Sequence, residues 1–256
     1  MSSSADRASD GFDGHSASEL AALLGVPRVE TYASVTSTLD VAHARAPTVP
    51  SGTLVLADEQ TAGRGTHGRR WSSPAGAGVW LALIARPGDA ASLDVLSLRC
   101  GLYAAEALDA LAGAAVGVKW PNDLQVGGLK LAGVLIETRW RGHTAEWAAI
   151  GFGLNVAAPS LPNATGLAAG RTRMEALVAL APALRRAADA RGHLTGEECS
   201  RWVVRDVARG RAIDRPSSGI VEGISPMGEL LVQGSDGSIV RHRTGSLTFA
   251  EPLACS

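Results

Sequence analysis

The thirteen residues from Glu59 to Trp71 concentrate side chains that can capture an anion, because three arginines and a histidine lie among three glycines. Each guanidinium offers a planar fork of N–H donors that suits phosphate or carboxylate, and glycines let the backbone come close to a ligand. The tryptophan that ends the run adds a flat face for a ring. Together these residue types indicate a site for a small anion that also has an aromatic part.

The elements that must position this run are two flanking strands. Apolar stretches at Thr53–Ala57 and Gly78–Ala85 read as strands, so we expect a loop between them. A solvated basic loop and a nucleic-acid patch with interleaved aromatic residues stay open as alternatives. The loop does not match the phosphate-binding pattern G-x-x-x-x-G-K-[ST], because no lysine follows, and it is not a G-x-G-x-x-G turn between a strand and a helix.

The composition excludes several classes of protein. The chain has 256 residues, 46% of them hydrophobic, and can form one large domain, alone or with a small module. A net charge of −1 argues against bulk nucleic-acid binding, which needs an excess of Lys and Arg. The cysteines, Cys100, Cys199 and Cys255, lack metal-binding spacing, which fits a reducing cytoplasm without a structural zinc. We expect no signal peptide and no membrane span, since glycine and proline interrupt the longest uncharged stretch, Trp147–Gly170.

The two lysines of the chain lie close together. Of the 24 basic residues only Lys119 and Lys130 are lysines, and both fall within thirteen residues of sequence, Val118 to Lys130. Lysine is a compact point charge that arginine does not always replace. The region from Val118 to Lys130 is therefore a second place where a specific charge is expected to matter.

Sequence patterns predict a mixed α and β domain followed by a small β unit. Residues 1–28 are rich in Ser, Ala and Gly and read as a mobile tail with a short helix at Ser18–Leu24. Residues 29–209 alternate strand and helix patterns, and beyond Gly210 short apolar pieces separated by glycines predict a β unit over residues 210–256. Further elements are expected as strands at 30–34, 116–120, 131–137 and 146–151 and as helices at 37–45, 93–111, 174–191 and 195–207.

Four motifs, read together, resemble the biotin–protein ligase family. They are Gln60–Trp71, Lys119–Asp123, Lys130–Gly133 and Gly151–Asn155. The pair Ser37-Thr38 also matches the start of the family's first helix, and the resemblance spans roughly residues 31–250 and is weakest at its C-terminal end. It implies an α+β catalytic domain with a mixed sheet, related to class II aminoacyl-tRNA synthetases, followed by an SH3-like β barrel. It also implies the form that lacks an N-terminal DNA-binding domain and has no repressor function.

The resemblance implies a cytoplasmic ligase that works in two steps. Biotin and Mg-ATP give biotinyl-5′-adenylate and pyrophosphate, and the biotinyl group then passes to a lysine of a biotin carboxyl carrier domain. A carboxylate that attacks an α-phosphorus brings two anions together, so cations and N–H dipoles must offset their repulsion. The cofactors expected are therefore ATP and Mg²⁺, with biotin as substrate. No DNA or membrane partner is expected, and a monomer and a dimer both stay open.

Individual roles also follow from the resemblance. The residues implied in catalysis are Lys130, Arg64 and Asp123. The residues implied in biotin binding are Ser37, Thr38, Gln60, Gly63, Arg64, Lys130 and Gly133. The residues implied in binding ATP or the adenylate are Arg64, Arg69, Trp71 and Asn155, and no protein site for a metal is expected. Asp123 either accepts the proton of the acceptor lysine or caps the Pro-Asn-Asp turn.

The sequence departs from the family pattern at two places. Thr66 stands where the family loop commonly has arginine, and Gly245-Ser246 stands where the family often has glycine followed by an acidic residue. Two other functions are considered: a lipoate or octanoate ligase of related fold, and a non-catalytic biotin sensor. The Gly-Arg-Gly loop and Lys-Trp-Pro-Asn-Asp match the first poorly, and an apparent ATP site argues against the second.

Overall fold

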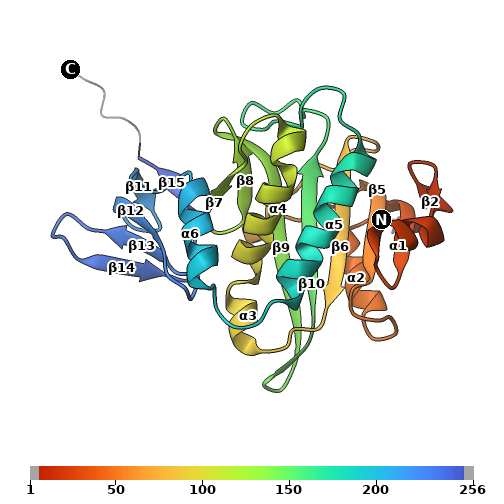
Figure 1. Ribbon diagram of the computed structural model, residues 1–256, viewed down its shortest axis with the longest axis horizontal. Helices are drawn as coiled ribbons and strands as arrows, with labels where there is room; N and C mark the ends of the chain where they lie inside the picture. The colour runs from red at the N-terminus through yellow and green to blue at the C-terminus, as the bar shows by residue number, and fades with distance from the viewer. Residues whose placement is uncertain (1–5, 251–256) are drawn as a thin grey trace.

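The computed structural model describes residues 6–250, and its centre is an eight-stranded mixed sheet in the order β1-β4-β5-β6-β10-β9-β8-β7 (Figure 1). The strands of this sheet are β1 (Arg7–Ala8), β4 (Val29–Val35), β5 (Leu54–Gln60), β6 (Gly78–Ala85), β7 (Gly117–Lys119), β8 (Asp123–Val126), β9 (Leu129–Arg141) and β10 (Thr144–Asn155). The β4–β5 pair is parallel and the other neighbouring pairs are antiparallel.

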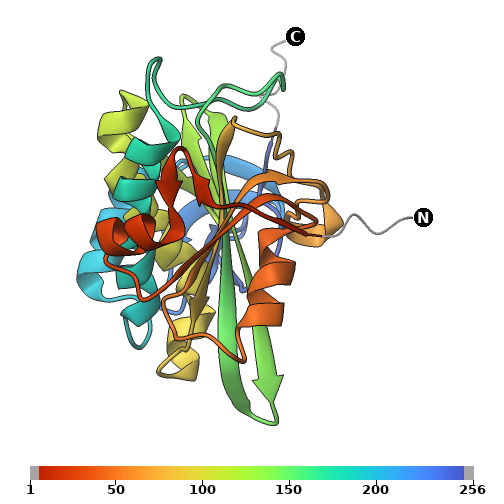
Figure 2. The same ribbon diagram turned by 90° about the vertical axis from the view of Figure 1, so that its right-hand side faces the viewer.

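Helices cover the two faces of this sheet unequally. Figure 2 shows α2 (Thr38–Arg45) alone on one face, with α1 (Ala17–Leu24), α4 (Leu96–Ala112) and α5 (Arg173–Asp189) on the other. All eight residues of β6 are buried, because both faces of this central strand are covered. No helix among residues 6–250 combines the length and the apolar character needed to cross a bilayer.

Helix starts follow the polar signals in the sequence. Ser37 is the N-cap of α2, and its hydroxyl accepts a hydrogen bond from the Leu39 N–H. Thr172 and Thr195 form capping boxes at α5 and at α6 (Gly196–Arg205). The helix expected at 93–111 is interrupted at Val95, which separates α3 (Ala90–Asp94) from α4.

A second, five-stranded antiparallel sheet follows α6 and lies at one end of the main sheet (Figure 1). Its strands are β11 (Ala212–Arg215), β12 (Gly219–Ile224), β13 (Leu230–Gln233), β14 (Ile239–His242) and β15 (Thr248–Phe249). The Trp120 indole N–H donates to the Gly228 carbonyl over 3.0 Å, so the small sheet packs against the Lys-Trp-Pro-Asn-Asp motif. The α+β domain followed by a small β unit that the sequence predicted is confirmed.

The N-terminal segment corrects the expected mobile tail. Within residues 6–28, β1 pairs with β4, and β2 (Gly11–Phe12) forms a hairpin with β3 (His15–Ser16). Phe12 and Leu20 are buried in the main core, and Arg173 pairs with Asp13 and Asp58. The helix predicted at 18–24 is α1, and residues 1–5 lie outside the described residues. Isolated apolar residues in a Ser-rich and Gly-rich stretch gave no periodic signal for this packing.

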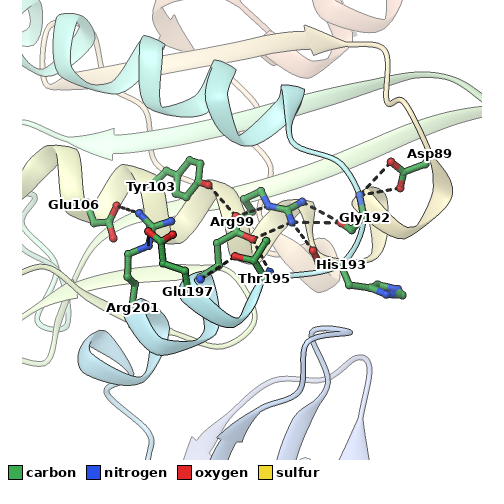
Figure 3. A network of polar contacts seen from close by, with 10 residues as sticks. Asp89, Arg99, Tyr103, Glu106, Gly192, His193, Thr195, Glu197 and Arg201 are labelled. Carbon is green, nitrogen blue, oxygen red and sulfur yellow. Dashed lines mark hydrogen bonds and ion pairs between the residues drawn. The ribbon is translucent and has the colours of Figure 1, made fainter.

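A buried ion pair fastens α6 to α4. Arg99 of α4 donates to both carboxylate oxygens of Glu198, over 2.7 and 3.1 Å, and also to the carbonyls of Gly192 and His193. Figure 3 shows the Arg99 guanidinium directed at the chain that leads into α6, with the Tyr103 ring beside it. The Tyr103 hydroxyl donates to Glu198 over 2.9 Å. The start of α6, the helix that precedes the small sheet, is thereby joined to the helical layer.

Candidate active site

A floor of glycines on β9 and β10 makes room for a cavity on the α2 face of the sheet. Gly153 lies directly opposite Gly133, and Gly151 lies opposite Leu135. A Cβ at Gly153 would lie 2.5 Å from Nε1 of Trp71, and one at Gly133 would lie 3.3 Å from the same ring. The Trp71 indole can therefore lie against the sheet only because these positions lack side chains.

The Gly-Arg-Gly segment is a loop between β5 and β6, as the sequence predicted. Its two limbs are held together by the Trp71 N–H donating to the Gly63 carbonyl over 2.9 Å and the Gly65 N–H donating to the Arg69 carbonyl over 2.8 Å. A short 3₁₀ turn, η1 (Thr66–Gly68), forms the tip. The loop lies over the cavity, because Arg64, Gly65, Thr66 and Arg69 all line it.

One end of the cavity is polar and uncharged. Gln60 Oε1 accepts from the Thr38 N–H over 2.9 Å and from the Thr38 hydroxyl over 3.1 Å. The Gln60 amide nitrogen donates to Ser73 over 2.8 Å, and the Ser37 hydroxyl is 3.5 Å from Gln60 Oε1. The start of α2 and the end of β5 thus bring the predicted residues Ser37, Thr38 and Gln60 together as neutral donors and acceptors.

The other end of the cavity carries the two lysines. Lys130 Nζ lies 2.6 Å from Asp123 Oδ1 and 5.1 Å from the centre of the Trp71 ring, a cation–π distance. Lys119 lines the same cavity beside Asp123. Burial lowers the pKa of Lys119, Asp123 acts to raise it, and the nearby cations Lys130, Arg211 and Arg69 lower it further. An anion that enters here would meet concentrated positive charge.

Arg64 is turned toward carboxylates. Its guanidinium donates to both oxygens of Glu137 over 3.1 Å and to Asp40 over 2.5 Å. Burial acts to lower the pKa of Arg64, but the hydrogen bonds to Asp40 and Glu137 outweigh burial and raise it. Arg64 uses three of the five N–H donors of a guanidinium in these bonds, which leaves two N–H groups without a partner among residues 6–250.

Three predicted site residues lie around the margins of this cavity. Asn155 lines a neighbouring cavity on the side of Trp71 and Lys130, where its amide nitrogen donates to the Thr165 carbonyl over 3.1 Å and to the Lys130 carbonyl over 3.5 Å. Gly63 is buried at the base of the loop, where a Cβ would lie 2.5 Å from the Trp71 carbonyl oxygen. Arg69 is exposed and lines the main cavity.

Several residues that line the site were not predicted to belong to it. Gly245, Ser246 and Leu247 bring the small sheet into the cavity wall, and Glu137 holds Arg64. The scarcity of lysine had pointed to the region of Lys119 without giving it a role. Period-two alternation along β9 places Glu137 on the same face as Gly133, but it does not identify Arg64 as its partner. Among residues 6–250, no group of three or more His, Cys, Asp or Glu side chains is arranged to hold a metal.

Comparisons with known proteins agree on one family. The model of the biotin/lipoate A/B protein ligase family matches residues 30–155. A biotin–[acetyl-CoA-carboxylase] ligase of Paracoccus denitrificans is 34% identical over 219 residues, which cover 75% of this chain and 88% of that protein. The bifunctional ligase/repressor BirA of Bacillus spizizenii is 39% identical over 124 residues, which are 48% of this chain but only 38% of that protein.

A solved structure shows that the fold is shared as well. The biotin protein ligase from Aquifex aeolicus, in complex with biotin and ATP, aligns with a TM-score of 0.72 at 24% identity, covering 87% of this chain and 99% of that one. The mixed sheet with its helices and the small C-terminal sheet therefore match the fold of the Aquifex aeolicus protein.

Proposed function

The chain belongs to the biotin–protein ligase family, and from this premise we propose that it joins biotin to ATP as biotinyl-5′-adenylate and then transfers biotin to a protein lysine. The observation that carries the proposal is one cavity with a neutral polar end at Gln60 and a cationic end at Lys130. Biotin has the same polarity, since its ureido ring offers a carbonyl and two N–H groups and its side chain ends in a carboxylate. The resemblance implies biotin binding by residues at both ends, Ser37, Thr38 and Gln60 at one and Lys130 at the other.

Biotin is proposed to lie over the glycine floor. Ser37, Thr38 and Gln60 bond the ureido group, while Gly133 leaves space for the side chain, and Lys130 receives the carboxylate. Because Lys130 already pairs with Asp123, the incoming carboxylate would have to share the ammonium with Asp123. Gly63 supports this arrangement by letting the base of the loop close against Trp71.

The adenylate is proposed to extend past Trp71 toward Asn155. The adenine packs near the Trp71 indole, and stacking of a base on an aromatic side chain contributes about 1–3 kcal/mol. The family resemblance implies that Asn155 contacts the adenylate, and an asparagine amide can pair with two atoms of adenine, N6 and N7. Because its amide nitrogen is already bound to two carbonyls, only the amide oxygen is left to accept from the adenine amino group.

The first step needs charge compensation more than covalent chemistry. As the biotin carboxylate oxygen bonds to the α-phosphorus of ATP, the bond to the β,γ-pyrophosphate breaks and pyrophosphate leaves with its electron pair. Lys130, Arg69 and the two remaining N–H groups of Arg64 would offset the repulsion between the two anions. Mg²⁺ enters as part of the Mg-ATP substrate, where phosphate oxygens supply most of its ligands.

The second step needs a base. The amine of an acceptor lysine attacks the biotinyl carbonyl, AMP leaves, and the amine loses a proton, for which Asp123 is the carboxylate in the cavity. The ion pair with Lys130 holds Asp123 in the cavity, beside the position proposed for the biotin carboxylate. We propose a biotin carboxyl carrier domain as acceptor, supported by the name of the Paracoccus denitrificans relative.

Biotin-dependent exchange of pyrophosphate into ATP tests this function directly. We expect exchange with biotin and none with lipoate or octanoate, and a loss of at least about 100-fold in Lys130→Ala, in line with the loss of a charge-stabilising donor. Arg186→Ala on α5, which lies on the opposite face of the sheet, removes one cation as a matched control and should keep exchange unchanged.

The other outcomes of the exchange assay would each identify one of the two alternative functions. Exchange with lipoate or octanoate and none with biotin would make the chain a ligase of the related type. Biotin binding in a calorimeter without any exchange would identify a sensor.

A further inference from the structure

A chain of hydrogen bonds runs from Arg64 away from the cavity into the sheet, through Glu137 and His43 to Trp147. We propose that His43 and Trp147 are positioning residues that fix Glu137, and through it hold Arg64 and the loop closed over the reaction intermediate. The effect on the intermediate rests on the proposed function. The chain of hydrogen bonds itself, called the relay below, is a property of the protein without ligand.

Arg64 is the side chain that ties the tip of the loop to the rest of the domain. Between residues 64 and 70, Arg64 makes the side-chain bonds that leave the loop, to Asp40 on α2 and to Glu137 on β9. Arg70 bonds instead to the Thr61 carbonyl at the loop's own base. A cavity separates the loop from β9 and is lined by Leu135 and Glu137. The hydrogen bonds of Arg64 therefore determine how far the loop can move away from α2 and β9.

The direction of the hydrogen bonds fixes the state of His43. The Trp147 indole N–H lies 3.0 Å from His43 Nδ1, and an indole can only donate, so Nδ1 must accept. His43 is then the neutral tautomer with its proton on Nε2, which donates to Glu137 Oε2 over 3.0 Å. A proton on Nδ1 would face the indole N–H, and the two donors would repel each other.

Glu137 is therefore held from two directions. Its Oε1 accepts from Arg64 Nε, and its Oε2 accepts from both Arg64 Nη2 and His43 Nε2. The carboxylate cannot rotate without breaking one of these bonds. Because α2, β9 and β10 each supply one member, the relay places the loop relative to α2, whose first turn carries Ser37 and Thr38.

The relay is separable from the binding machinery because neither His43 nor Trp147 lines the main cavity. Changing them should therefore affect how long the loop stays closed, and with it the release of the intermediate, and should leave capture of biotin nearly unchanged. Loss of one ordinary hydrogen bond corresponds to a factor of about five in an equilibrium or rate.

The experiment compares His43→Phe with His43→Gln in the full chain. Phenylalanine removes donor and acceptor at similar size, whereas a glutamine amide keeps one of each. We expect His43→Phe to raise the release rate of preformed biotinyl-5′-adenylate about fivefold with an unchanged KM for biotin, and His43→Gln to restore most of the retention. Trp147→Phe should raise release about twofold, since His43 keeps its bond to Glu137. His193→Phe, a matched change beside Asp94, should have no effect.

A second measurement separates this inference from the proposed function. Hydrogen exchange of residues 61–72 in the ligand-free protein should be about fivefold faster in His43→Phe than in the wild type and should return toward it in His43→Gln. If the wild type forms no biotinyl adenylate, the proposed function fails while this exchange result still tests the relay. Equal loop exchange in all variants, or a glutamine variant as fast as phenylalanine, would overturn the relay.

Discussion

Two arginine–glutamate pairs in this protein have the same local chemistry and different surroundings. Arg99–Glu198 and Arg64–Glu137 are both bidentate, and each glutamate accepts a third bond from a ring-bearing residue, Tyr103 or His43. The side chains of the first pair are 1% and 4% exposed, whereas those of the second are 35% and 31% exposed. The same contacts thus join two helices in a buried place in one pair, and hold a loop over a cavity at a partly exposed place in the other.

The remaining donors of the two arginines show the same contrast. Arg99 also donates to the carbonyls of Gly192 and His193, as Figure 3 shows, so its capacity for hydrogen bonds is directed into the fold. Arg64 keeps two N–H groups without a partner among residues 6–250 and lines a cavity. By the same count Arg99 bonds four of its five N–H groups, against three for Arg64. A half-exposed arginine with spare donors beside a cavity is suited to receive a ligand, and a buried one that bonds carbonyls of the fold is suited to hold structure.

The largest expected difference is in stability. Glu198→Ala leaves the Arg99 charge buried without its partner, so we expect the free energy of unfolding to fall by about 3–5 kcal/mol. Glu137→Ala leaves Arg64 partly in water and still beside Asp40, so we expect a loss of about 1 kcal/mol or less. Urea denaturation of both variants measures this. Equal losses would mean that burial does not separate the two pairs.

The pH dependence of stability gives a second comparison. Burial acts to raise the pKa of Glu198, but hydrogen bonds from Arg99, the Thr195 N–H and Tyr103 outweigh burial and lower it from 4.5 to about 2. The folded chain then binds fewer protons than the unfolded chain, so the stability from Glu198 is complete above pH 4.5 and is lost as the pH falls toward 2. Its size is on the order of 3 kcal/mol.

Unfolding curves of the wild type and of Glu198→Gln, measured from pH 7 down to about pH 2, test this dependence. The advantage of the wild type over the glutamine variant should narrow across the window from pH 4.5 to about 2. A constant difference through that window would show that the carboxylate gains nothing from its charge.

Much of the fold could be predicted because its elements carry strong local signals. The strand β6 is found at the predicted residues, since a strand buried on both faces is a continuous apolar run. The start of α2 followed from Ser37 as N-cap. The break at Val95 had no glycine or proline to mark it, and the packing of Phe12 depends on distant partners such as Arg173.

The candidate site, like the fold, has parts that the sequence predicts and parts that it does not. The loop with Arg64 and the Lys130 turn are short contiguous motifs, so the sequence indicated them. The partners of Arg64 could not be predicted, because Asp40 and Glu137 lie on a helix and a strand far apart in the sequence. Their meeting depends on the order of β6, β10 and β9 in the sheet, which periodicity does not reveal.

An activity measurement tests the role of Arg64 as the exposed member of the comparison. Arg64→Ala should raise the rate of adenylate release about tenfold, as the loss of about 1.4 kcal/mol would, and should weaken plain biotin binding much less. The physical reason is that the loop loses its tether while Ser37, Thr38 and Gln60 stay in place. Chase experiments with preformed adenylate and calorimetry with biotin measure the two effects. Comparable losses for both ligands would count against Arg64 as a loop residue.

A smaller effect than that of Glu198→Ala is expected from the bond that Tyr103 makes to Glu198. Tyr103→Phe removes a hydroxyl that donates over 2.9 Å and keeps the ring, which has the guanidinium groups of Arg186 and Arg201 each 5.0 Å from its centre. Arg99 and the Thr195 N–H still satisfy the carboxylate, so we expect a loss of about 0.5–1.5 kcal/mol. Thermal unfolding should show a decrease in Tm of about 2–4 °C. A loss as large as that of Glu198→Ala would mean that Tyr103, and not burial, holds the joint together, and the contrast with the His43 relay would then disappear.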